Sequence, residues 1–378
     1  MIGKKNFMLA MCFFAGFKAT HAQTSSDGRT GNIISTAVPF LLVAPDARSG
    51  AMGETGAATT PDISSTHWNP SKLAFLNDSY GFSVSYSPWM QKFVPDINMA
   101  YLNGYYKLDD RNVLGASLRY FSYGDIQMTG EQSQDLGVYN PNELAFDATL
   151  ARSFGNNFSL GLSARYIYSN LSSGFVNGAN QNIAATAFAA DISGYYRSDK
   201  KPFAGKEATY SAGLNISNIG TKIQHTEGGP KDFLPTNMRL GGALTYHADE
   251  LSDLTFTIDA NKLLVPTLPN STKSVPAAIF GSFSDAPGGF SEELQELNFG
   301  FGAEYMYNKQ FAVRVGYFYE SPEKGNRNYL TLGAGLKYNI MNIDMAYIAA
   351  STQKSPLAQT LRFTLAFNFA EVAAAVKK

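Results

Sequence analysis

The sequence predicts an all-β fold, a fourteen-stranded antiparallel transmembrane β-barrel with an N-terminal plug segment in its lumen. Aromatic residues make up 13% of the chain and charged residues only 16%, below the roughly 25% of soluble domains. After the N-terminal segment, no run of about 18 apolar residues could span a bilayer as a helix. Instead, apolar and polar residues alternate from Tyr80 onward. Membrane strands alternate in this way because one face meets lipid and the other meets water.

Residues 1–22 are typical of a secretory signal peptide. Lys4 and Lys5 form a charged start, residues 7–17 are largely apolar, and Ala22 is a small residue at the expected cleavage position. The alternative, a membrane anchor, needs a longer apolar stretch. The single cysteine, Cys12, lies in this segment. We therefore expect a mature chain without disulfides or thiolate metal sites.

Fourteen segments show the period-two pattern of strands. In segment 158–168, apolar residues from Phe158 to Tyr168 alternate with small or polar ones, as expected when successive side chains lie on opposite faces. An even number of strands places both ends of a barrel on one side. The predicted strands are 80–87, 96–107, 112–123, 143–154, 158–169, 184–197, 208–219, 236–247, 253–261, 296–307, 310–320, 328–338, 340–348 and 360–369.

The connections between these strands alternate in length. Tight turns are expected at 109–110, 155–157, 249–250, 308–309 and 339, and longer loops at 124–142, 170–183, 220–235, 262–295 and 349–359. Outer-membrane barrels have short periplasmic turns and longer outer loops. The sequence therefore predicts an N-terminal and plug segment at 23–79, a barrel at 80–369, and a short periplasmic tail at 370–378.

Ten charged residues fall at positions that should point into the lumen. Neighbouring strands carry opposite charges at these positions, and such cross-strand pairs stabilise a sheet modestly. We interpret them as lumenal ion pairs that brace the barrel and its plug. A charged conduction path is the alternative, although balanced charges select poorly between ions. The predicted pairs are Arg119–Asp147, Arg165–Asp191, Arg239–Asp259, Glu304–Arg314 and Asp344–Arg362.

The stretch 46–74 lacks strand alternation and is rich in Gly and Ala. Small residues allow backbone to pack closely in a narrow lumen, so this stretch is the predicted plug. Trp68 is expected to anchor it in the barrel wall, and Asn69-Pro70 marks a turn. His67 has no companions for a metal site. The plug residues singled out are Asp46, Arg48, Gly53, Asp62, Trp68, Asn69 and Pro70.

The Gly-rich stretch with Asp62 and Asn69-Pro70 resembles the N-terminal hatch of the fourteen-stranded FadL-type fatty-acid transporters. A closer resemblance covers nearly the whole mature chain. The strings GFSVSYSPWMQKFVPDINMAYLNGYYKLDD at 81–110, LGASLRYFSYGDI at 114–126 and PLAQTLRFTLAFNF at 356–369 are similar to the PorV (LptO) family of the type IX secretion system of Bacteroidetes. These strings are specific, because generic barrels share the alternation but not the strings.

This resemblance implies a role in protein export without covalent chemistry or a cofactor. Members of the family dock on the giant translocon barrel of the system and receive cargo through its C-terminal signal domain. They deliver the cargo to the cell-surface sortase and attachment-complex subunits, which remove the signal and attach lipopolysaccharide. The implied location is the outer membrane, in contact with its lipid and lipopolysaccharide, with long loops at the cell surface.

Two outer loops are the candidate partner-binding surfaces. Apolar residues on a long outer loop favour a protein contact, although folding onto the barrel rim is an equal alternative. In the first loop, Trp and Met are typical of interface cores, and a membrane-surface aromatic belt is the alternative. The residues are Leu264, Val265, Leu268, Ile279, Phe280 and Phe283 in loop 262–295, with Trp89, Met90 and Phe93 in the first loop.

Two other classes of function fit the sequence less well. A FadL-like transporter of hydrophobic solutes needs an apolar lumen, but the inward positions are mostly small, polar or charged, with few large apolar groups such as Phe121 and Phe318. An enzyme needs a poised base or nucleophile, and no such arrangement stands out around His247. The net charge of −1 implies no nucleic-acid partner.

Overall fold

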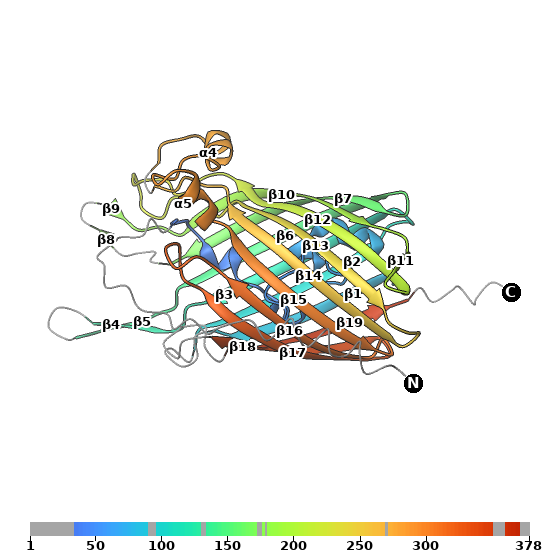
Figure 1. Cartoon of the computed structure of the whole chain (residues 1–378). Helices are drawn as coiled ribbons and strands as arrows, with labels where there is room; N and C mark the ends of the chain where they lie inside the picture. Colours follow the sequence, from blue (N-terminus) through green and yellow to red (C-terminus); the bar gives the residue numbers. More distant parts are fainter. Residues whose placement is uncertain are drawn as a thin grey trace. The chain divides into compact units, whose positions relative to one another are not determined.

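The computed structural model describes residues 34–89, 96–129, 134–171, 176–177, 180–268, 271–350 and 360–370. Fourteen long antiparallel strands form the barrel (Figure 1). They are β1 Tyr80–Pro88, β2 Asn98–Lys107, β3 Asn112–Ser122, β6 Asn142–Phe154, β7 Phe158–Asn170, β10 Ala185–Arg197, β12 Lys206–Gly220, β13 Asn237–His247, β14 Ser252–Leu263, β15 Asn298–Tyr307, β16 Phe311–Tyr319, β17 Asn328–Tyr338, β18 Met341–Ala350 and β19 Leu361–Phe369.

The ring is closed because the first and last strands pair. β1 pairs with β19 from Tyr80↔Phe369 to Tyr86↔Phe363, and β10 pairs with β12 on the other side of the ring. The remaining strands pair with their neighbours in chain order. Closure removes the unpaired edges that a strand could not expose to lipid, and it confirms the predicted fourteen-stranded barrel.

Period-two alternation decides which side chains face the lumen. Along β7, alternate residues are exposed and buried from one end to the other: Leu162 is exposed, whereas Ser163 and Arg165 are buried. The exposed side of the ring is apolar, and the buried side is largely small or polar. A barrel in lipid requires this distribution.

The two ends of the barrel differ in their connections. At one end, here called the tight-turn end, neighbouring strands are joined by short turns. Asn308 and Lys309 both have positive φ, at 52° and 53°, as in the turns that suit a twisted hairpin. At the opposite, long-loop end, the connections carry elements of their own (Figure 1).

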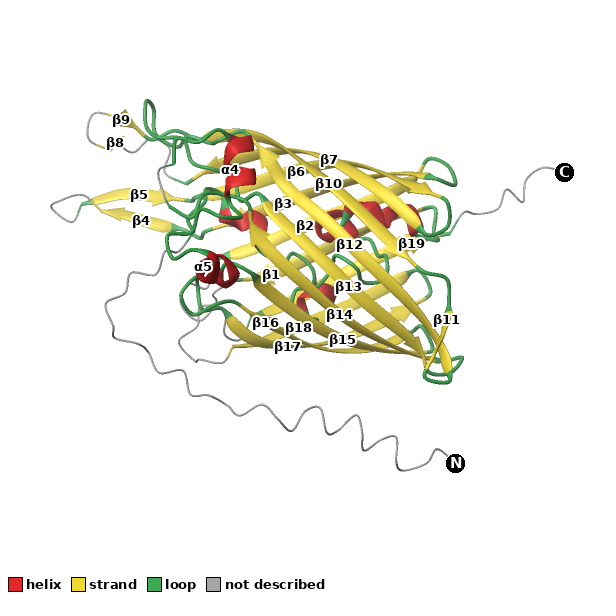
Figure 2. Ribbon diagram, turned by 45° about the horizontal axis from the view of Figure 1, so that its top comes forward, coloured by secondary structure: helices red, strands yellow, loops and turns green. Residues whose placement is uncertain are grey.

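The long connections contain structure that alternation does not predict. Two short hairpins, β4 Ile126–Thr129 with β5 Asp135–Tyr139 and β8 Val176–Asn177 with β9 Asn180–Gln181, extend from the long-loop end (Figure 2). Two short helices, α4 Val275–Gly281 and α5 Phe290–Gln295, lie in the predicted loop 262–295. At the tight-turn end, β11 Lys201–Phe203 lengthens the β10–β12 hairpin.

Residues 34–79, here called the inner segment, lie inside the ring. They form four short helices, which are η1 Pro39–Leu42, α2 Ala47–Gly50, α3 Ser65–Trp68 and η2 Pro70–Phe75. Figure 2 shows such helices surrounded by the strands. Among the described residues, no helix is long and apolar enough to cross a membrane.

The inner segment runs through the barrel from one end to the other. At the long-loop end, the Ala37 amide donates to the Phe233 carbonyl oxygen at 3.0 Å. At the tight-turn end, the Ser79 amide donates to the Phe369 carbonyl oxygen at 3.0 Å, directly before β1 begins. The segment therefore enters the lumen beside the long loops and leaves it beside the tight turns.

Candidate functional site

The inner segment is fixed around a buried tryptophan. Asp46 and Trp68 are 0% and 1% exposed. The Asp46 carboxylate caps α2 by accepting from the Ser49 amide at 2.9 Å, and it also accepts from the Trp68 indole N–H. The Arg239 guanidinium of β13 lies 4.2 Å from the centroid of the Trp68 ring. Trp68 thus contacts both its own segment and the barrel wall.

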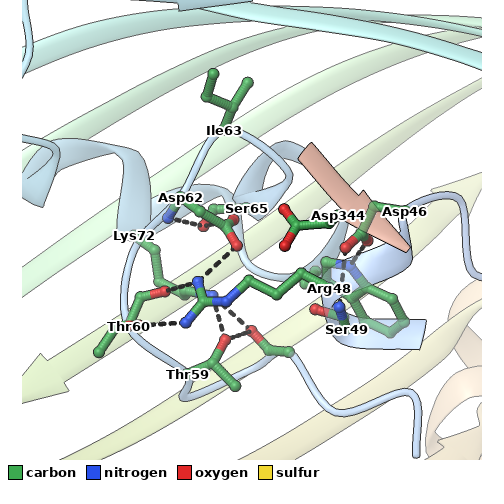
Figure 3. A network of polar contacts seen from close by, with 12 residues as sticks. Asp46, Arg48, Ser49, Thr59, Thr60, Asp62, Ile63, Ser65, Lys72 and Asp344 are labelled. Carbon is green, nitrogen blue, oxygen red and sulfur yellow. Dashed lines mark hydrogen bonds and ion pairs between the residues drawn. The ribbon is translucent and has the colours of Figure 1, made fainter. Parts of the chain in front are cut away.

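Arg48 joins the inner segment to the barrel wall, and Figure 3 shows its contacts with Asp62 and Thr60 inside the segment. Its guanidinium contacts Asp62 at 2.8 Å and Glu304 of β15 at 2.9 Å, and it donates to the Thr60 carbonyl oxygen at 3.0 Å. Glu304 also contacts Arg314 of β16 at 2.6 Å. Paired and hydrogen-bonded charges are the form in which buried ions are tolerated.

The Gly-rich part of the segment approaches the strands through backbone. Asp259 of β14 accepts from the amides of Gly56 and Ala57 at 2.7 and 2.9 Å. Gly53 has φ +65°, and a Cβ there would lie 2.5 Å from the Phe301 carbonyl oxygen. Only glycine meets both conditions without strain. The Asn69 side-chain amide donates to the Ala57 carbonyl oxygen at 2.8 Å, and Pro70 begins η2.

Two further residues of the inner segment, the half-buried His67 and the buried Lys72, were not predicted to have a role. Burial and the nearby Arg119 hold the pKa of His67 well below its usual range. Because a guanidinium has only donors, His67 accepts from Arg119 through Nδ1, at 2.6 Å. Lys72 donates to the Gly56 carbonyl oxygen at 2.8 Å, and burial lowers the pKa of Lys72 to about 8.

All ten predicted lumenal charges are buried or half-buried, and none is exposed on the lipid side. Two of the five predicted pairs are present. Arg165 contacts Asp191 at 3.0 Å, and Arg314 contacts Glu304 at 2.6 Å. Because the charges face inward in all ten cases, the register read from the sequence agrees with the structure.

The other three predicted pairings are wrong. Asp147 contacts Arg165 instead of Arg119, and Asp344 contacts Arg314 instead of Arg362. Arg119 donates to the Leu41 carbonyl oxygen, and Arg362 contacts Glu54, both in the inner segment. Arg239 and Asp259 form no ion pair in the described part of the chain, because Trp68 and the Gly56 and Ala57 amides engage them instead.

These pairings differ from the prediction because an arginine side chain is long and because a glycine on the intervening strand leaves it space. Arg314 of β16 reaches past β17 to Asp344 of β18, and a Cβ on Gly335 of β17 would lie 2.8 Å from its Nη1. A sequence rule that pairs only adjacent strands cannot anticipate this contact. Nor can it anticipate partners from the inner segment.

Two cavities border the inner segment. One, of about 430 Å³ at the tight-turn end, is lined by polar and charged groups that include Arg48, Asp62 and Asp344. The other, of about 300 Å³ at the long-loop end, lies between the start of the inner segment and residues such as Phe233 and Leu268. Between them, the polar contacts of the inner segment occupy the lumen. No group that could hold a metal ion occurs among the described residues.

At the long-loop end, the described residues 264–268 and 271–297, here called the outer cap, carry the helices α4 and α5. Its most exposed apolar side chains are Phe280 of α4, at 79%, and Phe290 of α5, at 77%. These values exceed those of every large apolar residue on the described strands, of which Phe188, at 65%, is the most exposed. Leu268, Phe283 and Leu294 are also exposed, at 52%, 48% and 51%.

The structure divides the predicted contact residues. Leu268, Phe280 and Phe283 are exposed, and Ile279 is half-buried. Leu264 and Val265 are 2% and 1% exposed, which contradicts their prediction as contact residues. They directly follow β14 and pack into the barrel rim, as the alternative for this loop expected. Phe290, an apolar residue of the same loop that was not named as a contact residue, is also exposed. The acidic residues Glu292-Glu293 after it are typical of the first turn of a helix.

The first loop does not present the predicted aromatic surface. Trp89 is half-buried and packs against two lumenal apolar clusters, one with Phe121 and one with Phe318. Its ring also faces the Arg362 guanidinium, 5.8 Å from the ring centroid. The prediction of Trp89 as an outer contact residue is therefore wrong. Met90 and Phe93 lie outside the described residues.

Comparison with known proteins decides the family. The model of the family "Type IX secretion system protein PorV" matches residues 25–270. The chain belongs to the PorV family. Its matched region includes the whole inner segment and the strands from β1 to β14. None of the curated proteins matches the chain significantly.

Solved outer-membrane barrels are similar to this PorV-family chain at low identity. The toluene transporter TbuX of Ralstonia pickettii is 14% identical over 86% of this chain and 98% of its own, with a TM-score of 0.49. The toluene transporter TodX of P. putida is 13% identical over 86% and 98%, with a TM-score of 0.49. A FadL homologue of Pseudomonas aeruginosa is 11% identical over 90% and 100%, with a TM-score of 0.43.

Proposed function

We propose that this barrel is the outer-membrane shuttle of a type IX secretion system. In this role it docks on the translocon barrel, binds the C-terminal signal domain of exported cargo, and delivers the cargo to the sortase and attachment complex at the cell surface. The observation that carries the proposal is the family match over residues 25–270. A carrier of this kind needs an exposed contact surface rather than a conduit.

The outer cap supplies such a surface. Phe280 and Phe290, exposed at 79% and 77%, belong to α4 and α5, which lie at the long-loop end (Figure 1). Exposed aromatic side chains at this density mark binding sites more often than solvated loops, and Phe is enriched at interfaces. We assign partner contact to Leu268, Phe280, Phe283 and Phe290, with the half-buried Ile279 beside them.

The lumen supports a carrier more than a conduit for hydrophobic solutes. An apolar ligand needs a pocket lined mainly by apolar side chains. Here the middle of the lumen holds ion pairs such as Arg48–Glu304 and Arg165–Asp191. The FadL-like transporter therefore remains an outcome for the experiment to decide.

The test is affinity capture of the protein from detergent-solubilised outer membranes, with identification by mass spectrometry. We expect a very large barrel protein together with proteins that carry type IX signal domains. Replacing both cap phenylalanines, Phe280→Ser with Phe290→Ser, should reduce their recovery at least about tenfold, because central aromatic anchors dominate binding energy. Leu108→Ser is the matched control, since Leu108 is 52% exposed but lies at the tight-turn end.

The possible results separate the candidates. Recovery of both protein classes from wild type and from the Leu108→Ser control, with loss in the double variant, supports the shuttle and the assigned surface. Equal recovery from the double variant contradicts the surface. No secretion proteins, together with fatty acid bound to the purified barrel, would replace the shuttle with the transporter.

A further inference from the structure

Beneath α5 lies a cluster of buried lysine and glutamate side chains. Lys262, at the outer end of β14, contacts Glu293 at 2.9 Å and Glu296 at 2.7 Å. Lys324, in the loop between β16 and β17, contacts Glu292 at 2.6 Å and Glu296 at 3.2 Å. Glu296 is thus shared by two lysines that come from separate parts of the barrel rim.

Four of these five side chains are removed from solvent, and the fifth, that of Glu292, is 14% exposed. The side chains of Lys262 and Lys324 are 5% and 4% exposed, and that of Glu296 is 0% exposed. The glutamates are further satisfied within the cap, because Glu296 accepts from the Thr267 hydroxyl at 2.7 Å and Glu293 from the Ala286 amide at 2.8 Å. Buried charges with several partners hold their geometry, whereas exposed pairs contribute little.

The loop that carries Lys324 is itself held in place. At its two ends, Arg327 donates two hydrogen bonds to Glu320, from Nε at 2.7 Å and from Nη2 at 2.8 Å. A two-pronged arginine–carboxylate contact fixes orientation as well as distance. Lys324 therefore extends from a loop whose two ends are joined by this contact.

The same helix presents apolar groups to solvent. Phe290 and Leu294 are 77% and 51% exposed and lie four residues apart, hence on one face of the helix. Glu293 and Glu296, three residues apart, lie on the face that meets the lysines. A six-residue helix has little stability of its own. The contacts of its glutamate face therefore determine how its apolar face is presented.

We propose that Lys262 and Lys324 are positioning residues that hold α5 as a preformed docking element, whose Phe290 and Leu294, with Phe280 of α4, enter an apolar pocket of a folded protein partner. This inference rests on the proposed function and specifies how its contact surface is built. A surface that is already ordered binds more tightly, because less side-chain and loop freedom is lost on association.

The charges of the cap favour a protein over a lipid surface as the occupant. Attachment to phosphate-bearing lipid relies on clustered, accessible basic side chains. Here both lysines are engaged by glutamates and buried, and the first turn of α5 is acidic, with Glu292 and Glu293. Lys273, within the cap, is 44% exposed but is paired with Asp285 at 3.2 Å. The cap thus offers exposed aromatic rings without a cluster of basic groups, which suits an apolar pocket on a protein.

The test measures the affinity of the full-length barrel in detergent for the translocon barrel recovered in the capture experiment. Lys324→Gln and Lys262→Gln should each weaken binding about tenfold, since they free α5 without altering the contact face. Lys324→Arg should retain near-wild-type affinity because it keeps the charge. Lys200→Gln is the control, because Lys200 forms an exposed pair with Glu207 away from the cap. Barrel integrity is followed by heat-modifiable gel mobility.

A second measurement reports the position of α5 without any partner. Protease cleavage within residues 271–274, directly before α4, should be faster in the two glutamine variants than in wild type, the arginine variant or the Lys200→Gln control. Cleavage at the wild-type rate in the glutamine variants, or binding at the wild-type affinity, overturns the inference.

The outcomes distinguish this inference from the function on which it rests. If the Phe280→Ser, Phe290→Ser protein loses affinity while both glutamine variants retain it, the inference fails and the shuttle stands. If wild type binds no secretion protein, both fail. A wild-type dimer that the phenylalanine changes dissociate would assign the surface to a second copy of this chain, and would also overturn the proposal.

Discussion

At the residue scale, the lumen is organised around arginines that each serve more than one partner. Arg165 contacts Asp147 at 2.5 Å and Asp191 at 3.0 Å, and it also donates to the Asn218 side chain. The two carboxylates are 4% and 1% exposed, so neither has water as a substitute partner. Asn218 itself, at φ +61°, is held where the β10–β12 register shifts.

Replacing Arg165 by alanine should therefore cost about 3–5 kcal/mol of unfolding free energy, because it leaves two buried carboxylates without their counter-charge. Urea unfolding of the detergent-solubilised barrel measures this change. Lys200→Ala removes a pair whose side chains are 57% and 59% exposed, and should cost no more than about 1 kcal/mol. Equal effects of the two changes would contradict a bracing role for the lumenal cluster.

At the element scale, the strands could be predicted from the sequence and the loops could not. The largest differences between predicted and observed strand ends are two residues, as at 96 against Asn98 and 261 against Leu263. Alternation predicts strands well because every second side chain must be apolar in lipid. The outer cap has no such repeat. Lys262 and Lys324 are far apart in the sequence and come close to the same glutamate only in the folded chain. Their cluster with Glu296 was therefore not foreseen.

The inner segment shows the same division. Its place in the lumen follows from composition, and Asp46, Arg48, Gly53, Asp62, Trp68, Asn69 and Pro70 all lie where the segment turns or contacts itself and the wall. The partners of the lumenal arginines could not be predicted from composition, because Arg119 and Arg362 bind groups of this segment. Composition places such a segment without specifying its path.

Gly53 tests the fit between this segment and the strands. Gly53→Ala should displace the segment, because a Cβ there would lie 2.5 Å from two backbone carbonyl oxygens, of Phe301 and Tyr317. The chain has two tryptophans, and the buried Trp68 reports the displacement as a red shift in fluorescence. Gly155→Ala is the control, since Gly155 also has positive φ, +80°, but nothing within 4 Å. A red shift of equal size in both variants would show that the strain of a positive φ, and not a clash with the strands, causes the displacement.

At the scale of the whole molecule, the barrel has two different ends that should face different compartments. The outer cap and the hairpins lie at one end, and turns such as 308–310 lie at the other (Figure 1). Since short turns face the periplasm in bacterial barrels, the cap should face the outside. The shuttle depends on this orientation, because its proposed partners act at the surface.

Single cysteines can determine the orientation. Thr272→Cys in the outer cap should react with a membrane-impermeant maleimide on intact cells, whereas Asp110→Cys in a tight turn should react only after lysis. Both positions are exposed, and the only native cysteine, Cys12, lies in the predicted signal peptide. Labelling of position 110 on intact cells would reverse the assigned orientation and exclude the cap as a surface docking site.

The path of the inner segment also constrains how the protein is assembled. Residues 37–79 pass through the ring, entering beside Phe233 and leaving beside Phe369. A chain threaded in this way cannot be inserted after the ring is complete unless its free end is drawn through the lumen. In the simplest order of events, the strands assemble around the segment, and the pairing of β1 with β19 forms last. The segment would then act during biogenesis as a template around which the strands assemble. A poorly fitting segment would slow closure of the ring before it lowered the stability of the finished barrel.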